Sequence, residues 1–313
     1  MGNIFYFNWE VSLMVFLQSA MGDFGVKLAS FFSFFGKEMV VVAIVGFFYW
    51  CYDKKAGKLF GVSVLATVIW NPMIKNIFFR RRPYFDNESI KCFEKVDSSA
   101  DIYDIKVQGF SFPSCHSANS VSLYGSIAWY YKKKVFWCIG LILIFGIGFS
   151  RVMLGVHYPT DVIAGWLLGL LISIALAALR KRVSEKCILL ILFLTAVPGL
   201  FYCKSADFFT AFGMLIGIFA GFLFEEKFVK FKNTKIAARS IVRLLGGLIV
   251  FALIAVGSKV FFAEEFLNSQ TPLSLIVRIL RYAVASFAVM ALYPMVFSPA
   301  DKFWKKCRLN ETV

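Results

Sequence analysis

Long apolar runs separated by short charged connectors constrain the fold of this chain more than any other feature of its sequence. Of its 313 residues 59% are hydrophobic and only 17% are charged, and the charges cluster between the apolar runs. This distribution argues against a water-soluble domain. Six runs approach or reach the roughly 20 apolar residues that cross a bilayer, namely 57–78, 160–179, 187–203, 206–224, 240–262 and 275–297.

Three shorter runs, 39–52, 117–131 and 135–150, are also bracketed by polar connectors. With them the sequence predicts an all-α, polytopic membrane protein of about nine transmembrane helices. Residues 1–36 carry polar side chains among many Phe and Leu, and we expect them to form an amphipathic segment that lies at the membrane interface without crossing. Residues 187–313 carry no recognisable chemistry and are expected to form further membrane helices.

The net charge of +15 is distributed by connector rather than gathered in one patch. One set of connectors is strongly basic, which by the positive-inside rule makes them cytoplasmic; it comprises 53–58, 132–134, 180–186, 227–243 and the tail with Lys302, Lys305, Lys306 and Arg308. In the connector 79–115, six Lys or Arg are matched by six Asp or Glu. We therefore expect 79–115, 151–159, 204–207 and 263–271 to face outside with the N-terminus, the C-terminus to be cytoplasmic, and nucleic acid not to be a partner.

The chain has seven cysteines but no CxxC pair and no His-spaced metal pattern. Several cysteines lie in predicted spans or on the reducing side, so the sequence predicts neither a disulfide framework nor a metal site. Cys92 and Cys115 share the outer side, although Cys115 belongs to a motif described below.

The first polar motif ends a predicted span and reads Lys75 to Pro83, with Lys75 and Arg82 seven residues apart. Two helical turns would bring these two cations to one face. The alternative is that Lys and Arg near a helix end reach toward lipid headgroups, an interpretation that we favour for Arg80 and Arg81.

The second motif is Pro113-Ser114-Cys115-His116, directly before the run that begins near Ser117. A helix that starts here offers free backbone N–H groups and the positive end of its dipole to an anion. The simpler interpretation is that Ser114 is only an N-cap.

The third motif runs from Ser150-Arg151 to His157 and Asp161, across the junction of two predicted spans. Asp161 lies one helical turn beyond His157 and can reach an imidazole N–H. In the alternative, His157 is a buried polar residue and Asp161 a helix-start charge. That account leaves unexplained why the two histidines of the chain, His116 and His157, both lie on the outer side beside cations.

Together the three motifs contain what phosphate-ester hydrolysis requires. Lys75, Arg82 and Arg151 can hold phosphoryl oxygens, and Ser114 with nearby backbone N–H groups can complete the cradle. Asp161 identifies His157 as the histidine held neutral and oriented as base or nucleophile, which by elimination leaves His116 as the proton donor. Two other interpretations of these residues fit less well. A metal site would place a divalent ion beside three cations, which would oppose its binding, and a Ser114-His-Asp hydrolase would leave the cations without a role.

The motifs Lys-x6-Arg-Pro, Pro-Ser-x-His and Ser-Arg-x5-His-x3-Asp resemble those of the type 2 phosphatidic acid phosphatase superfamily, in order, over residues 39–180. The resemblance implies a six-helix-type phosphatase core, which we place at 37–180. The apolar runs beyond it predict a C-terminal transmembrane extension at 181–313. The resemblance also implies a phosphohistidine on His157 with Asp161 as its partner and His116 as the acid. It further implies that Lys75, Arg82, Ser114, Cys115 and Arg151 bind phosphate, with no cofactor or metal. Cys115 departs from the family, which usually has Gly there.

The motifs do not separate the branches of that superfamily. We expect a lipid phosphate or pyrophosphate as substrate, because a site at the bilayer surface meets amphiphiles readily, in a bacterial plasma membrane or the endoplasmic reticulum. The expected number of spans and the outer N-terminus are also similar to the glucose-6-phosphatase layout. A phosphotransferase to an alcohol acceptor and a lipid transporter or binder are the remaining alternatives. The loop 84–111 is the expected substrate-selecting element, while the exact substrate and the oligomeric state are not encoded in these motifs.

Overall fold

The computed structural model describes residues 2–96 and 100–298, and its regular elements are helices throughout that part of the chain. This confirms the predicted all-α fold. Among the described residues, eight helices are long and apolar enough to cross a membrane, and they are Asn8–Gly36, Lys54–Phe78, Lys134–Met153, Pro159–Leu179, Glu185–Tyr202, Ala206–Val229, Ala237–Phe261 and Pro272–Val296. The basic tail from Lys302 to Arg308, used above to orient the chain, lies outside the described residues.

Seven of the nine predicted runs coincide with these eight helices. The other two, 39–52 and 117–131, form shorter or broken helices: Glu38–Tyr52 is apolar but short, and residues 115–131 are interrupted by a π-helical turn at Val121–Gly125. The eighth long helix is Asn8–Gly36, in the segment that we expect to lie at the interface.

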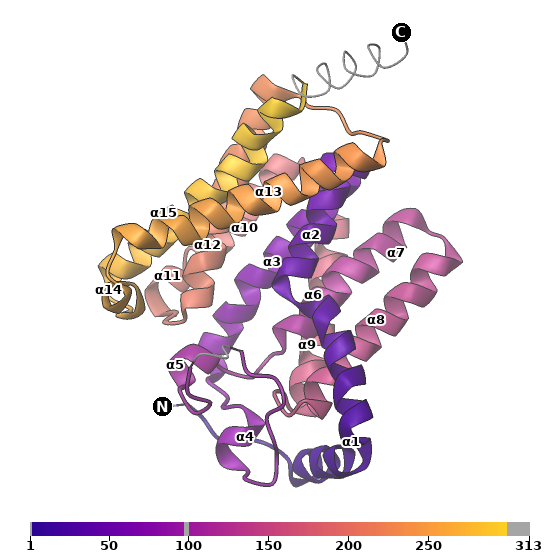
Figure 1. The fold of residues 1–313 in the computed structure, drawn as a ribbon, viewed down its shortest axis with the longest axis vertical. Coiled ribbons are helices and arrows are strands. Elements are labelled where there is room, and N and C mark those ends of the chain that lie inside the picture. The colour runs from indigo at the N-terminus through magenta and orange to yellow at the C-terminus, as the bar shows by residue number, and fades with distance from the viewer. Residues whose placement is uncertain (1, 97–99, 299–313) are drawn as a thin grey trace. The chain divides into compact units, whose positions relative to one another are not determined.

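Helix α1 (Asn8–Gly36) is divided by a kink at Gly22, whose φ of 53° lies in the left-handed region that favours glycine. Figure 1 shows the two halves running in different directions. Each half has 14 residues and is about 20 Å long, shorter than the hydrocarbon core of about 30 Å. The interfacial location of residues 1–36 stays a prediction.

The helices fall into two compact units. Unit 1 comprises Met1–Val42, Leu59–Val183 and Pro198–Phe208, and unit 2 comprises Ala43–Lys58, Ser184–Val197 and Phe209–Val313. The helices that build or border unit 1 are α1, α2 (Glu38–Phe47), α3 (Lys54–Phe78), α4 (Pro83–Asp86), α5 (Ile105–Gln108), α6 (Cys115–Ser120), α7 (Ser126–Tyr131), α8 (Lys134–Met153), α9 (Pro159–Leu179) and α11 (Gly199–Tyr202). All eight residues predicted for the site belong to unit 1.

Unit 2 has its own polar contacts at the connectors between its helices, which are α10 (Glu185–Ala196), α12 (Ala206–Phe224), α13 (Ala237–Gly257), α14 (Glu264–Asn268) and α15 (Pro272–Phe287). The ammonium of Lys54 pairs with the fully buried carboxylate of Glu225. The Arg243 guanidinium donates to the carbonyl oxygens of Trp50 and Lys232 at 3.0 and 2.9 Å. Lys54 and Arg243 thus find partners within unit 2, while the Oε2 of Glu225 is buried without a hydrogen-bond partner among the described residues.

Two glycines allow α9 to pack directly on α6 in unit 1. A Cβ on Gly165 would lie 2.5 Å from the Ser114 carbonyl oxygen, and one on Gly169 would lie 2.4 Å from that of Ala118. The two positions are four residues apart, so they share one helix face, the small-residue spacing that lets membrane helices approach closely. The close approach also brings the Ser114 N–H to the Asp161 carbonyl oxygen at 2.9 Å.

Exchanging Gly165 for alanine tests this close packing. We expect Gly165→Ala to lower the apparent melting temperature in detergent, because the added methyl group overlaps a backbone oxygen and overpacking typically costs about 1–3 kcal/mol. Gly125→Ala is the matched control, since its Cβ would meet its nearest neighbour at an ordinary 3.8 Å. Equal melting of the two variants would contradict the direct contact of α6 with α9.

Candidate functional site

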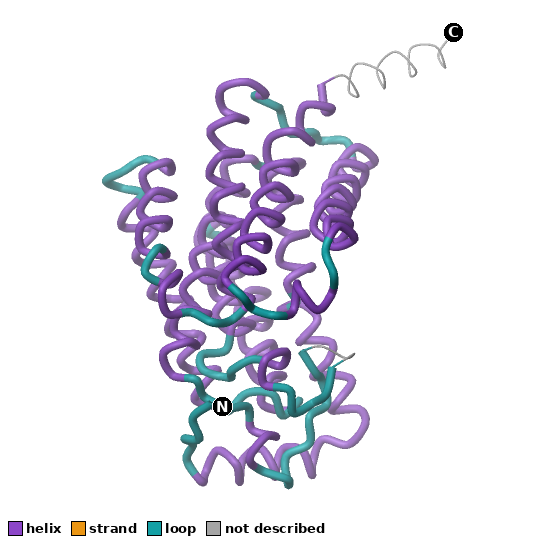
Figure 2. The backbone as a smooth tube through the Cα atoms, turned by 90° about the vertical axis from the view of Figure 1, so that its left-hand side faces the viewer, coloured by secondary structure: helices purple, strands orange, loops and turns teal. Residues whose placement is uncertain are grey.

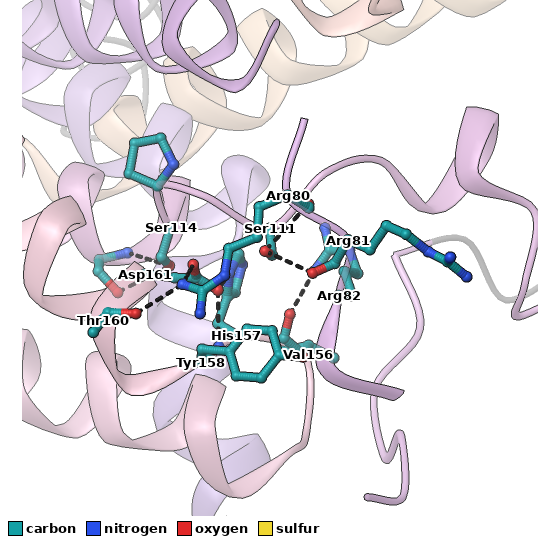
Figure 3. Close-up of polar contacts among 12 residues, drawn as sticks. Arg80, Arg81, Arg82, Ser111, Ser114, Val156, His157, Tyr158, Thr160 and Asp161 are labelled. Carbon is teal, nitrogen blue, oxygen red and sulfur yellow. Dashed lines mark hydrogen bonds and ion pairs between the residues drawn. The ribbon is translucent and has the colours of Figure 1, made fainter. Parts of the chain in front are cut away.

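The first motif leaves α3 through an abrupt turn. Phe79 takes a φ of 52°, its N–H donates to the Lys75 carbonyl at 2.9 Å, and the chain then runs extended to Arg82, the N-cap of α4. Successive side chains of an extended segment point to opposite sides. Arg80 and Arg82 are accordingly 2% and 4% exposed, whereas Arg81 points away from them (Figure 3) and pairs with Asp86.

Arg82 and Lys75, predicted to share one helix face, are both buried but differ in their partners. The Arg82 Nε donates to the carbonyl oxygens of Gln108 and Gly109 at 2.8 and 3.3 Å, and its Nη1 to that of Val156 at 3.0 Å. Among the described residues the Lys75 ammonium has no hydrogen-bond or ion-pair partner, although its side chain lies at the end of α3 in the same neighbourhood. Arg82 therefore links two connectors, while Lys75 keeps its donors available.

Our interpretation of Arg80 as a headgroup anchor is wrong. Its guanidinium forms ion pairs with Glu10 at 2.9 Å and Asp161 at 2.7 Å and donates to the Thr160 hydroxyl at 2.7 Å. Both carboxylates are 0% exposed. The spacing that marks Lys75 and Arg82 gives no sign of this, because Glu10 lies 70 residues away in the chain.

The second motif begins α6 as expected. Ser114 is the N-cap, and its hydroxyl oxygen accepts from the Ser117 N–H at 3.3 Å and the Ser117 hydroxyl at 2.9 Å. Cys115 and His116 follow as the first helical residues, whose N–H groups have no partner inside a helix. His116 packs against Gly36 of α1, where a Cβ would approach its ring to 2.9 Å. Ser114 is therefore the N-cap of α6, while its binding of phosphate stays a prediction.

The third motif joins α8 to α9 through a tight turn at Gly155. Its φ of 78° and the Lys91 carbonyl oxygen, 2.1 Å from where a Cβ would be, allow only glycine there. Two residues later His157 is 3% exposed, and Asp161 follows in the first turn of α9. Burial, and then the nearby cations Arg82, Lys75 and Arg151, lower the pKa of His157 well below its usual range.

His157 and Asp161 face one another, as the spacing predicts. The Asp161 Oδ2 lies 3.4 Å from the His157 Nδ1 and accepts the Tyr158 N–H at 2.8 Å, while its Oδ1 binds Arg80 (Figure 3). The His157 Nδ1 is buried and has no hydrogen-bond partner among the described residues. The pair is therefore an electrostatic contact that needs only a small movement to become a hydrogen bond.

Arg151, in the last turn of α8, is held from the side by a carboxylate that the sequence analysis missed. Its Nη1 donates to the Ser33 hydroxyl at 2.5 Å and pairs with Glu94 at 2.9 Å. Burial works to raise the pKa of Glu94, but Arg151, then Ser33 and Lys37, outweigh it, so the net shift is downward and the carboxylate is ionised. The Arg151 Nε is buried without a partner in the described part of the chain.

The fold thus gathers the predicted residues around one point. Lys75, Arg82 and Arg151 act electrostatically on His157, and the same three cations and His157 act on His116. The unpartnered Nε of Arg151, the Lys75 ammonium and the start of α6 border this cluster. Such an arrangement can bind a tetrahedral oxyanion beside a neutral imidazole. In the described residues, no group of three His, Cys, Asp or Glu side chains could hold a metal ion.

Comparison with known families now adds to this geometry. The model of the PAP2 superfamily matches residues 56–185, and that of the PAP2 superfamily phosphatase transmembrane extension matches residues 209–301. This chain belongs to the PAP2 superfamily. With its transmembrane extension and long apolar helices, this PAP2 protein is an integral membrane protein.

Several curated proteins resemble this PAP2 chain. It is 30% identical to the undecaprenyl-diphosphatase of Sulfolobus acidocaldarius over 152 residues, which cover 47% of this chain and 66% of that protein. It is 38% identical to phosphatidylglycerophosphatase B of Bacillus subtilis over 86 residues (24% and 42%) and 38% identical to lipid A 4'-phosphatase of Bacteroides thetaiotaomicron over 61 residues (20% and 27%). The chain therefore spans less than two thirds of each of these relatives. No solved structure matches it.

The contacts of Arg82 lead to a prediction about its connectors. We expect Arg82→Lys to accelerate proteolysis within loop 84–111 and to lower the melting temperature, because lysine cannot reproduce bonds to three carbonyl oxygens and a charged hydrogen bond contributes about 1.5–3 kcal/mol. Arg81→Lys is the matched control, since Arg81 makes an ion pair that lysine can keep. If both variants resist protease like the wild type, Arg82 does not hold the loop.

Proposed function

We propose that this PAP2 superfamily protein is a membrane phosphatase that hydrolyses a phosphomonoester or pyrophosphate of a lipid through a phosphohistidine on His157. The observation that carries the proposal is a buried imidazole that lies beside a carboxylate, Asp161, and among three cations, of which Arg151 has a buried Nε without a partner in the described part of the chain. Phosphoryl transfer demands chiefly positioning and charge stabilisation, which this cluster supplies.

In the first step the neutral His157 Nε2 attacks phosphorus and the bond to the leaving oxygen breaks. Asp161 moves closer from its 3.4 Å separation to accept a hydrogen bond from Nδ1–H, which stabilises the positive charge that develops on the ring. Lys75, Arg82 and Arg151 bind the phosphoryl oxygens, helped by the N–H groups at the start of α6, where Cys115 can contribute through its backbone. The Ser114 hydroxyl caps that helix and keeps the N–H groups in place.

His116 supplies the proton to the leaving oxygen. It lies on the first turn of α6, within the electrostatic reach of His157 and the same three cations. In the second step water attacks the phosphohistidine, His116 takes a proton from that water, and inorganic phosphate leaves as the bond from phosphorus to His157 breaks. The two histidines thus divide the roles of nucleophile and acid–base catalyst.

A lipid substrate is supported by the relatives, whose names specify phosphatidylglycerophosphate, undecaprenyl diphosphate and lipid A as what they act on. The proposed site faces the extracytoplasmic side, because its residues lie on or next to the connectors 79–115 and 151–159, which lack the excess of Lys and Arg of the other set. Residues 3–10 contact Phe79, Arg80 and Thr160, which supports an N-terminus on the same side.

Phosphate release by the detergent-purified protein tests the function. Because the proposed chemistry uses no metal, we expect release with chelator present from at least one of phosphatidic acid, undecaprenyl pyrophosphate and phosphatidylglycerophosphate. We expect little release from glucose 6-phosphate, because the proposed substrate is a lipid. His157→Ala should abolish release, since no phosphoenzyme can form without the nucleophile.

Two results would contradict this proposal. Inactivity of the wild type on all four compounds would favour a binding or transport role. Full activity of His157→Ala would remove the phosphohistidine from the mechanism, whatever the substrate.

The pH dependence provides a separate test. Because its pKa is lowered, His157 stays neutral as the pH falls through 6.5, so we expect the acidic limb of kcat/KM to lie below pH 6.5. Protonation of His116, the proposed acid, does not remove activity in that direction. Measuring a monoester and a pyrophosphate substrate separates the enzyme from the substrate, because a limb shared by both belongs to the enzyme. A shared limb at or above pH 6.5 would contradict the lowered pKa.

A further inference from the structure

Arg80 is bound on every side although the chemistry above does not use it. Its Nη1 donates to Asp161 and Thr160, its Nη2 to Glu10, and its Nε to the Phe5 carbonyl at 2.8 Å. The guanidinium also stacks on the Tyr158 ring, 4.1 Å from its centroid. A planar fork held at each nitrogen has a fixed orientation, and it fixes the orientation of the carboxylate that it binds.

Glu10 holds the other end of this arrangement from the first turn of α1. Its Oε2 accepts the Phe7 N–H and the Arg80 Nη2, both at 2.9 Å. Its Oε1 accepts the Thr160 N–H at 3.0 Å and the Thr160 hydroxyl at 2.6 Å. One fully buried carboxylate thus joins the start of α1, Arg80 and the first turn of α9, which carries Asp161.

The charges in this group do not cancel. Glu10 and Asp161 each contribute one negative charge and Arg80 one positive charge, so one negative charge remains beside His157. Without Glu10, Arg80 would neutralise Asp161 and leave the imidazole with no net countercharge. Charges are weakly screened in a buried site. The one negative charge that Glu10 leaves on this group therefore stabilises the His157 ring, which becomes positive during attack.

We propose that Glu10 and Arg80 are positioning residues for the reaction, which set the orientation and the net charge that Asp161 presents to His157. The proposal rests on the function proposed above. Glu10 lies outside the segment, residues 56–185, that matches the PAP2 superfamily, so the N-terminal segment completes the site.

The groups that face His157 come from five parts of the fold. They are Lys75 of α3, Arg82 before α4, His116 of α6, Arg151 of α8 and Asp161 of α9. Among the described residues that face the ring, Asp161 is the one with a negative charge, so a change in its effective charge acts directly on His157.

The experiment compares Glu10→Gln, Arg80→Gln and the double variant with Arg81→Gln as the matched control, because Arg81 is adjacent in sequence but points away (Figure 3). We expect Glu10→Gln to lower kcat about 10- to 100-fold with little change in KM, since the phosphate-binding cations are untouched and a misplaced partner has effects of this size. The acidic limb should move to lower pH, because loss of the countercharge disfavours imidazolium.

The double variant separates charge from folding. Arg80→Gln leaves Glu10 and Asp161 as two buried like charges, whereas the double variant returns the group to one negative charge. We expect the double variant to be more active than Arg80→Gln. An equal or lower activity would overturn the charge argument, as would Glu10→Gln with the kcat and pH profile of Arg81→Gln.

A second readout needs no substrate. The chain has two histidines, so nuclear magnetic resonance of protein labelled with 15N-histidine gives two imidazoles, and His116→Gln assigns them. We expect wild-type His157 to carry its proton on Nδ1 and Glu10→Gln to shift protons to Nε2, because an Arg80 released by Glu10 takes both oxygens of Asp161. If the His157 signals are the same in both proteins, the proposal is overturned even in an active enzyme. If they shift in a protein inert on every lipid tested, the link stands and the proposed function fails.

Discussion

The burial of Arg80 between Glu10 and Asp161 is the interaction on which the organisation of unit 1 depends. A guanidinium removed from water is strongly destabilising unless ion pairs and hydrogen bonds replace its hydration, and removing one partner of a buried pair typically costs about 3–5 kcal/mol. The partners of Arg80 come from the N-terminal segment and from the first turn of α9. Displacing the N-terminal segment, the segment with Arg80 or the first turn of α9 would leave a buried charge uncompensated. This requirement makes the three parts assemble together.

The cations around His157 are the opposite case, because their positive charges are not matched by an equal number of negative charges. Lys75, Arg82 and Arg151 act on one histidine, but among the residues that the structure describes only Arg151 has a carboxylate partner, Glu94, and that contact occupies one edge of its guanidinium. Arg82 is satisfied by carbonyl dipoles instead of by an anion. Unit 1 therefore keeps a group with one net negative charge, Glu10, Arg80 and Asp161, next to a cluster with excess positive charge. Excess positive charge is the condition under which a phosphate dianion gains most from binding, and maintaining it in the free protein reduces stability.

Much of this could be predicted from the sequence, for identifiable reasons. The membrane helices follow from run length, and the site residues follow from fixed spacing within each motif, as for His157 and Asp161 one helical turn apart. The features that the sequence analysis missed depend on contacts between residues far apart in the chain, or on local backbone turns. Three consecutive arginines look alike in sequence, and the left-handed turn at Phe79 decides which of them point inward. Glu94 meets Arg151 across 57 residues, and no local pattern marks such a partner.

The division of labour within the chain follows from where these groups lie. The segment that matches the PAP2 superfamily holds all the groups proposed to touch phosphate. The countercharge comes from Glu10 in the N-terminal segment. Unit 2 contains ion pairs of its own, such as that of Lys54 with Glu225, and holds none of the eight predicted site residues. A motif can therefore specify the reacting groups of a membrane enzyme while leaving open the electrostatic balance that sets their reactivity, because that balance depends on any segment that folds against the motif.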